Sequence, residues 1–228
     1  ITSDVTLKAG TTYKLSGEYI VEAGATLNIE AGVKIISVYD DIVDYILIKQ
    51  GAKINAMGTA NAPIVMTSEK EEPGAWGGIH ICGKAHTNAE GGKGSSEIGG
   101  AVYGGNDDAD NSGKLQYVRV EYTGYAFDEE HEANGITFYG VGNGTIVDHC
   151  QAYKGSDDGF EFFGGSVNVS NMVVVSCSDD SFDWTEGWNG KGTDLVAYQE
   201  PKATLGYDCD CLIEADNNEN DNAASPID

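Results

Sequence analysis

The sequence predicts an all-β fold: a single-stranded, right-handed parallel β-helix, or β-solenoid, of about nine or ten coils. One motif recurs three times, and its apolar positions Ile136, Phe160 and Phe182 are separated by 24 and then 22 residues. Short stretches alternate apolar and polar side chains, as strands with one buried face do, and no window shows convincing helical periodicity. The 31 glycines, with many Asn and Asp residues, provide tight turns between such strands.

The expected strands follow one another along most of the chain. Residues 24–29 and 51–56 show the alternation most clearly, and residues 10–15 are a weaker version of it. The remaining expected strands share the same pattern: 64–67, 78–82, 115–122, 145–150, 167–169, 172–175 and 195–198. We therefore expect one β-helix domain over residues 1–215.

Two stretches do not fit a coil. Residues 90–112 are rich in Gly, Asn and Asp and predict a long surface loop. Residues 216–228 are polar and acidic, and they predict either a tail or a truncated final coil. A solenoid that ends there exposes the edge of its last coil, so assembly through a solenoid end is one expected way to cover it.

The triple repeat predicts which side chains stack on one another, because equivalent residues of successive coils lie about 4.8 Å apart. Two columns are expected inside the coil: Ile136, Phe160 and Phe182, and then Phe138, Phe162 and Trp184. One column is expected outside: Thr137, Glu161 and Asp183.

Acidic residues are expected to stack at the turn before each of these strands. Asp157 should lie beside Asp179, and Asp158 beside Asp180. Two carboxylates about 5 Å apart repel by roughly 1 kcal/mol in water and by about 3–4 kcal/mol at an effective dielectric of 20. Three explanations stay open: calcium or another divalent cation bound by these four aspartates, capping of turn amides, or a catalytic acid pair. For an enzyme, the catalytic candidates are Asp158, Glu161, Asp180 and Asp183.

A second cation candidate lies at the end of the predicted loop. Asp108 and Asp110 begin a D-x-D-x-S-G pattern that resembles the opening of calcium loops. An EF-hand is excluded, because its twelfth ligand would be Arg119. A calcium loop of another kind and a flexible acidic loop both remain open.

The charge balance limits the classes of partner. The chain carries 37 acidic and 13 basic residues, for a net charge of -24. This surface repels the phosphate backbone, so nucleic acid is excluded as a partner, and no apolar run approaches the ~20 residues that direct membrane insertion needs. The five cysteines leave at least one thiol free, and Cys209 with Cys211 makes a poor zinc site without nearby histidines.

Five stretches carry a resemblance to a known family: 24–35, 58–68, 76–85, 134–145 and 157–165. They resemble a right-handed β-helix family that is common among secreted and surface-anchored, lipoprotein-type proteins of Bacteroidota. The resemblance implies an extracytoplasmic location, either secreted or anchored at the outer-membrane surface. It implies no settled biochemical activity.

These observations predict a binding, adhesion or structural module that recognises a glycan or a surface protein and is stabilised by calcium. Trp76, Tyr139 and Trp188 are the candidate ligand-binding aromatics, although each could equally be packed against the protein. The alternative is a polysaccharide-active enzyme that uses the stacked carboxylates. A glycoside hydrolase is favoured over a lyase, because Arg119 is the only arginine and lies beside Glu121.

Overall fold

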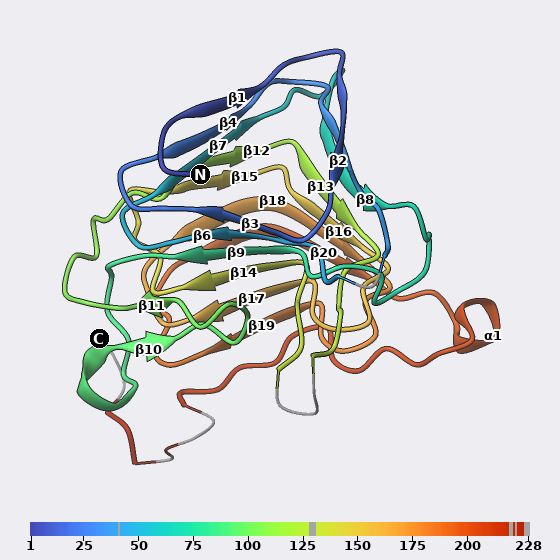
Figure 1. The fold of residues 1–228 in the computed structure, drawn as a ribbon. Coiled ribbons are helices and arrows are strands. Elements are labelled where there is room, and N and C mark those ends of the chain that lie inside the picture. Colours follow the sequence, from blue (N-terminus) through green and yellow to red (C-terminus); the bar gives the residue numbers. More distant parts are fainter. Residues whose placement is uncertain (41, 128–130, 219–220, 222, 226–228) are drawn as a thin grey trace.

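A computed structural model describes residues 1–40, 42–127, 131–218, 221 and 223–225 (Figure 1). The chain winds into a solenoid with three walls of parallel strands, which confirms the expected parallel β-helix. Each wall receives one short strand per coil, because turns of Gly, Asn and Asp interrupt the alternating segments. None of the helices within the described ranges is long and apolar enough to cross a membrane.

The first two walls form one continuous sheet. The first wall contains β1 (Val5–Leu7), β4 (Thr26–Ile29), β7 (Lys53–Met57), β12 (Gly113–Gln116) and β15 (Ile146–Asp148). The second contains β2 (Thr12–Leu15), β5 (Lys34–Ser37), β8 (Ile64–Ser68), β13 (Val118–Glu121) and β16 (Gln151–Tyr153). Two longer strands, β18 (Asn168–Val175) and β20 (Gly192–Tyr198), extend across both walls.

The third wall is a separate sheet of six strands in the described chain. It contains β3 (Glu18–Val21), β6 (Tyr45–Ile48), β9 (Ile79–Cys82), β14 (Ile136–Tyr139), β17 (Phe160–Phe163) and β19 (Phe182–Thr185). The side chains of its strands alternate between the solenoid interior and the outer face, and two candidate carboxylates, Glu161 and Asp183, lie on that outer face.

The number of coils is lower than expected. Six coils are complete in the described part of the chain, five with three strands and a sixth with β18 and β19, and β20 begins a seventh, whereas the sequence suggested nine or ten. The reason is that the coils differ in length. The register pairs Val5 with Leu27, so that coil has 22 residues. It pairs Ile54 with Gly113, so that coil has 59 residues.

The interior confirms both predicted columns. The register pairs Ile136 with Phe160 and Phe160 with Phe182, and the rings of Phe160 and Phe182 stack with centroids 5.8 Å apart. Phe138 stacks on Phe162 at 5.1 Å and an interplanar angle of 10°. Stacked rings in a close-packed interior stabilise the coil order beyond the burial of apolar area.

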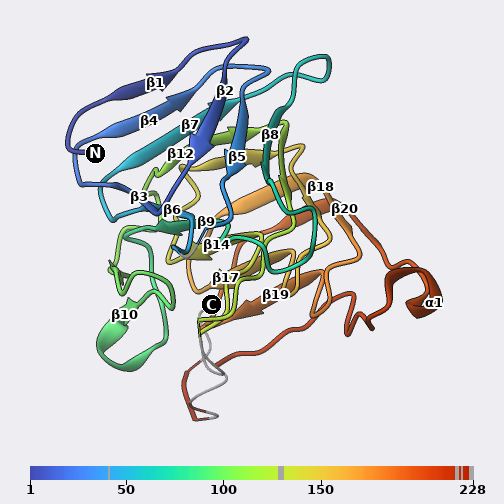
Figure 2. The ribbon, with the colours of Figure 1, turned by 45° about the vertical axis from the view of Figure 1, so that its right-hand side comes forward.

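The predicted loop 90–112 is a surface excursion with its own structure. It contains a 3₁₀ turn (Glu90–Gly92) and a hairpin of β10 (Gly94–Ser95) and β11 (Val102–Tyr103). The hairpin packs on the outer face of the third wall through Ile98 and Tyr103, which join a hydrophobic cluster with Tyr139. Figure 2 shows β10 on the outside of that wall.

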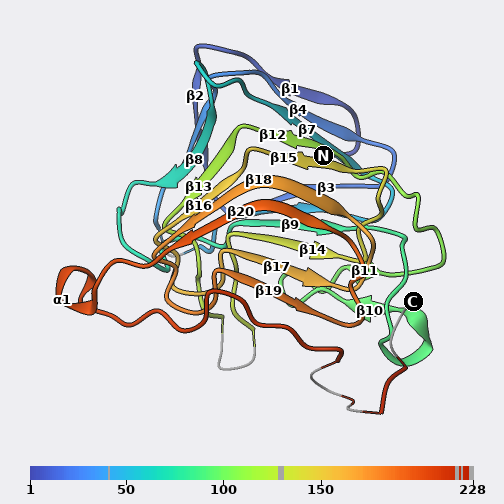
Figure 3. The same ribbon diagram turned by 180° about the vertical axis from the view of Figure 1, so that it is seen from behind.

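Residues 214–216 lie against β19. After the short helix α1 (Lys202–Leu205), the chain passes along the lower edge of the third wall (Figure 3). The amide of Glu214 donates to the carbonyl of Phe182 at 3.0 Å, and the amide of Asp216 donates to that of Trp184 at 2.9 Å. We name residues 209–217 the C-terminal strap. It covers the edge of the third wall, so residue 216 belongs to a bound segment rather than to a free tail.

Candidate functional site: an acidic pocket

A strongly charged cavity lies on the outer face of the third wall, beside its last three strands, β14, β17 and β19. Its volume is about 240 Å³. Ten carboxylate residues line it in the part of the chain that the structure describes, together with Asn134 and Thr185: Glu97, Glu132, Asp157, Asp158, Glu161, Asp179, Asp180, Asp183, Glu214 and Asp216. No lysine, arginine or histidine is among these described lining residues. We call this cavity the acidic pocket.

The floor of the acidic pocket is the predicted outward column. The register pairs Thr137 with Glu161 and Glu161 with Asp183, as the repeat indicated. Because Phe160 and Phe162 point into the core, the intervening Glu161 must point outward. Glu161 is nevertheless only 9% exposed, and it accepts a hydrogen bond from the side-chain amide of Asn134.

The turns beside the floor form a ladder of side-chain caps. The amide of Asp158 donates to Asn134 Oδ1 at 3.2 Å, and the amide of Asp180 donates to Asp158 Oδ1 at 2.9 Å. The amide of Cys211, in the C-terminal strap, donates to Asp180 Oδ1 at 2.7 Å. Turn capping, one of the three open explanations, therefore accounts for one oxygen each of Asp158 and Asp180. The backbone amides of Asp158 and Trp184 also bond to the carboxyl groups of Asp157 and Asp183, whereas Glu161 accepts its hydrogen bond from the side chain of Asn134.

Burial raises the pKa of most carboxyl groups in the acidic pocket, because the charged form loses its hydration. Desolvation, followed by the charges of Glu132 and Asp179, raises the pKa of Asp157 to about 8. Desolvation likewise raises the pKa of Asp183 to about 6, and it holds the pKa values of Asp158 and Glu161 well above their usual range. These shifts favour the protonated forms of the buried carboxyl groups, or a bound cation in place of the protons.

Four overlapping groups of side chains bring ligand atoms within 4.8 Å of one another. Three of these groups contain only oxygen: Asp157, Asp158 and Asp179; Asp158, Glu161 and Asp183; and Asp180, Asp183 and Glu214. Sets of carboxylate oxygens suit hard cations such as calcium.

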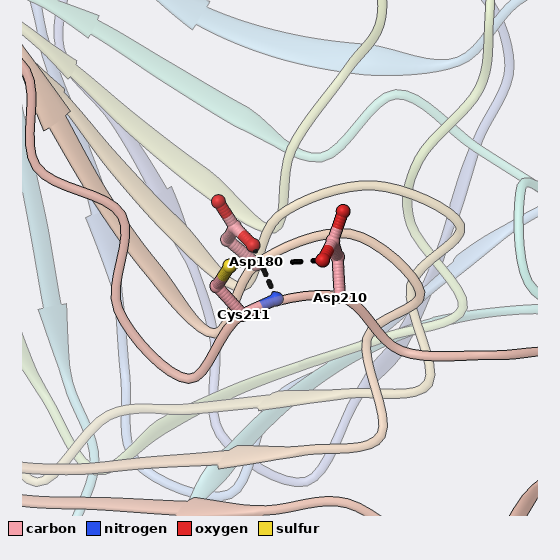
Figure 4. A group of neighbouring side chains, drawn as sticks. All are labelled: Asp180, Asp210 and Cys211. Atoms are coloured by element: carbon pink, nitrogen blue, oxygen red, sulfur yellow. Dashed lines mark hydrogen bonds between the residues drawn. The ribbon is translucent and has the colours of Figure 1, made fainter.

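The fourth group joins Asp180 to two residues of the C-terminal strap, Asp210 and Cys211 (Figure 4). The thiol of Cys211 lies 3.6 Å from Asp210 Oδ1. A thiol suits softer metals than calcium, and Cys211 is exposed, so this group forms the outer edge of the acidic cluster rather than its centre.

The structure brings together all the predicted carboxylates of the repeat, and it adds four that the repeat did not indicate. Glu97 comes from the hairpin excursion, where it accepts a hydrogen bond from Tyr139 Oη at 3.1 Å. Glu132 comes from the link between β13 and β14, and Glu214 and Asp216 come from the C-terminal strap. These segments do not repeat, so no periodicity marks them. The acidic composition was the only sequence signal.

Asp108 and Asp110 lie outside the acidic pocket and serve the excursion instead. Asp108 Oδ1 accepts hydrogen bonds from His86 Nδ1 at 2.7 Å and from the His86 amide at 3.1 Å. Asp110 accepts one from the amide of Lys84 at 3.1 Å. Neither residue belongs to the four groups of metal-ligand atoms found within the described ranges. Through these hydrogen bonds, both carboxylates hold the two ends of the excursion together.

The three aromatic residues considered as ligand contacts are packed against the protein. Trp76 is 1% exposed and donates from Nε1 to the carbonyl of Glu121 at 2.7 Å. Tyr139 is fully buried beneath the hairpin. Trp188 is partly buried and stacks on Phe162 at 4.7 Å. Of the two alternatives, packing describes these side chains.

Comparison with known proteins extends over the whole chain. The family model described as "Pectate-lyase like beta helix domain" matches residues 1–228. No curated protein matches the sequence. The matched range includes the coils, the hairpin excursion and the C-terminal strap, so the acidic pocket lies within the matched domain.

Proposed function

The chain belongs to the pectate-lyase-like β-helix domain family, and on this premise we propose that it is an extracytoplasmic glycan-binding module whose acidic pocket holds a divalent cation. One observation carries the proposal: ten carboxylate residues converge on one small cavity, and no basic side chain is among its described lining residues. A cation offsets this repulsion better than protons do, because it interacts with several carboxylates at once.

Calcium is the cation that this ligand chemistry favours. It takes roughly six to eight oxygen ligands in a flexible geometry, whereas magnesium demands a near-ideal octahedron. Asp158 and Asp183 each belong to two of the three all-oxygen groups, so they are central to the proposed site. Asp179 and Glu214 lie at the exposed rim, where solvent or a ligand has access.

The bound cation is also the link to the glycan in this proposal. A calcium ion whose coordination shell is not filled by protein accepts hydroxyl or carboxylate oxygens of a sugar. Without the cation, a chain with a net charge of -24 repels acidic polysaccharides. The family description, which refers to pectate lyases, agrees with a role connected to polysaccharides.

Calorimetric titration of chelator-treated protein with calcium tests the cation. The wild-type protein is expected to bind calcium and to unfold at a higher temperature in its presence. The double variant Asp158→Asn, Asp183→Asn should lose both effects. Glu30→Gln changes an exposed carboxylate between β4 and β5, and this variant should keep both calcium binding and the rise in melting temperature. If EDTA leaves the melting temperature of the wild-type protein unchanged and no heat of binding is measured, the cation proposal is wrong.

Retardation in native gels tests the glycan. The protein should migrate more slowly through gels that contain a soluble polysaccharide when calcium is present, and EDTA should restore its mobility. If no polysaccharide of a broad neutral and acidic panel retards the calcium-loaded protein, glycan binding is excluded.

A glycoside hydrolase is the second candidate, and a specific pair favours it. Glu161 and Asp183 are hydrogen-bonded to each other. The pKa of Asp183 is raised to about 6, while that of Glu161 is held well above its usual range. A pair of carboxyl groups that share a hydrogen bond can supply an acid and a base for glycoside hydrolysis. Release of reducing ends from a polysaccharide, abolished in Glu161→Gln, would support the enzyme. Binding without any such release would reject it.

A further inference from the structure

We propose that a second cavity, separate from the acidic pocket, binds a neutral pyranose unit of the same glycan; this inference rests on the proposed glycan-binding function. The cavity has a volume of about 390 Å³, within the size range of ligand sites. We call it the aromatic pocket. Its lining residues are Tyr39, Asp40, Ile42, Val43, Ala75 and Tyr125.

The aromatic pocket has one wall that is exposed and fixed in position. Tyr39 is 47% exposed and Ile42 is 59% exposed, so both present apolar surface to solvent. The Tyr39 hydroxyl accepts a hydrogen bond from Lys70 Nζ at 2.8 Å, and Nζ lies 4.5 Å from the centroid of the ring. This contact restrains the Tyr39 ring before any ligand arrives, which lowers the entropic cost of binding.

The Tyr125 side of the lining is held by a series of aromatic contacts. The Tyr125 ring meets Phe127 edge-on at 5.1 Å, and Phe127 meets Tyr45 edge-on at 6.3 Å. The amide of Tyr125 donates to the carbonyl of Trp76 at 3.3 Å. This bond connects the segment between β13 and β14 to a core residue. Two tyrosines, each with an apolar face and a polar hydroxyl, suit a sugar ring, which has the same two properties.

The charges around the aromatic pocket favour a neutral ligand. Lys70 pairs with Glu72 at 3.1 Å, so its charge is already offset. Asp40 adds a carboxylate that accepts hydrogen bonds from the Ile42 amide at 2.9 Å and from Ser16 Oγ at 3.3 Å. An anionic sugar would meet Asp40 without a compensating cation. A neutral sugar can donate hydroxyl hydrogens to it.

The position of the two cavities favours a polymer. Residues 39, 40, 42, 43, 75 and 125 lie on the links between the second and third walls in the second, third and fourth coils. The acidic pocket uses the same links in the fourth, fifth and sixth coils, through Glu132, Asp157 and Asp179. One antiparallel bridge, between Ala126 and Glu132, joins the Tyr125 segment to the acidic side. A linear glycan lying along this corner would contact both cavities in turn.

Native gels that contain a neutral polysaccharide test the inference. Hydroxyethylcellulose, arabinoxylan and galactomannan are the probes, with calcium present. At least one should retard the wild-type protein. Tyr39→Ala and Tyr125→Ala should each weaken that retardation by about tenfold. Tyr198→Ala removes a tyrosine that is 57% exposed on β20, away from the aromatic pocket, and should leave the retardation unchanged.

The outcomes separate this inference from the proposed function. If the wild-type protein and both pocket variants are retarded equally, the sugar binds elsewhere: the inference is overturned and glycan binding stands. Polygalacturonate is included as an acidic comparison; if it retards the wild-type protein and none of the three neutral probes does, the neutral subsite is rejected. If no polysaccharide retards it, both proposals fail. Unchanged melting temperatures of the variants establish that a loss of retardation is not a loss of fold.

Discussion

The outward column of the third wall differs sharply between its N-terminal and C-terminal halves, although the same backbone register runs through both. In the first three coils it contains Ile20, Leu47 and His80, and in the next three it contains Thr137, Glu161 and Asp183. Both halves are largely buried from solvent. One half meets an apolar cover, and the other meets further carboxylates.

The segments that pack over each half explain why its outward side chains can be buried. Leu47 is fully buried and belongs to the cluster that the hairpin completes with Ile98 and Tyr103. Even His80 fits this environment, because desolvation lowers its pKa to about 4 and keeps the ring neutral. Glu161 is buried among other acids and has no such relief without protons or a cation. The parallel β-helix thus determines which side chains stack, while the segments that cover the column determine whether its environment is apolar or acidic.

Placing a charge in the apolar half should have the largest effect. Leu47→Asp puts a carboxylate at a fully buried position under the hairpin, beside a His80 ring that burial keeps neutral. We expect it to lower the free energy of unfolding by about 3–5 kcal/mol, the usual consequence of an uncompensated buried charge. Chemical denaturation at pH 7 measures the loss. Leu47→Met is the matched control and should cost less than about 1.5 kcal/mol.

Removing charge from the acidic half should act in the opposite direction. Glu161→Gln with Asp183→Asn should stabilise the metal-free protein at pH 8 by about 1–3 kcal/mol, because fewer like charges are buried together. The same variant should no longer be stabilised by calcium. Glu22→Gln, which breaks the exposed pair with Lys49, should change stability by less than about 1 kcal/mol. A double variant that is less stable than the wild-type protein in EDTA would contradict this account of the acidic half.

The pH dependence of stability should differ with and without calcium. A carboxyl group whose pKa is higher in the folded than in the unfolded protein favours folding while it is protonated, and this contribution is lost as the pH rises through the folded value. The raised values are about 6 for Asp183, about 7 for Glu214 and about 8 for Asp157. The melting temperature in EDTA should therefore fall between pH 5 and pH 9, and saturating calcium should flatten the fall. A rise over this range in EDTA would reverse the assigned sign.

The smallest effect should be confined to the C-terminal strap. Its residues Asp210, Glu214 and Asp216 approach the carboxylates of Asp180 and Asp183. In EDTA at pH 8 the amides of Glu214 and Asp216 should exchange hydrogen faster than with calcium, by about tenfold. The amide of Lys49, bonded to the carbonyl of Val21 in the apolar half, should exchange equally in both conditions. Equal protection of the strap amides in the two buffers would show that repulsion does not loosen the strap.

The fold and the floor of the acidic pocket follow from the sequence because both depend on the repeat. The spacing from Phe160 to Phe182 predicts the stacked rings, and it places Glu161 beside Asp183 without any structural information. The number of coils does not follow from the sequence. The coil from Ile54 to Gly113 is 59 residues long, because it contains a segment without the repeat, although the strand register continues across it.

The walls of the site depend on segments without periodicity, so the sequence does not predict them. Glu97 reaches the acidic pocket because Ile98 and Tyr103 fasten the hairpin to the third wall. Glu214 reaches it because the C-terminal strap pairs with Phe182. The burial of Trp76 and Tyr139 was equally hidden, because an aromatic residue beside glycines has the same pattern in a core as on a surface.

The long turn between Ile54 and Gly113 has a consequence for how such a protein can be altered. The register resumes after the excursion, with Gly113 beside Ile54 and Leu115 beside Ala56. The two ends of the excursion are fastened locally, by the bonds of Lys84 and His86 to Asp110 and Asp108. A replacement segment of a different length is therefore compatible with the coil register, provided that the hydrogen bonds at its base remain and that it covers Leu47 as the present hairpin does.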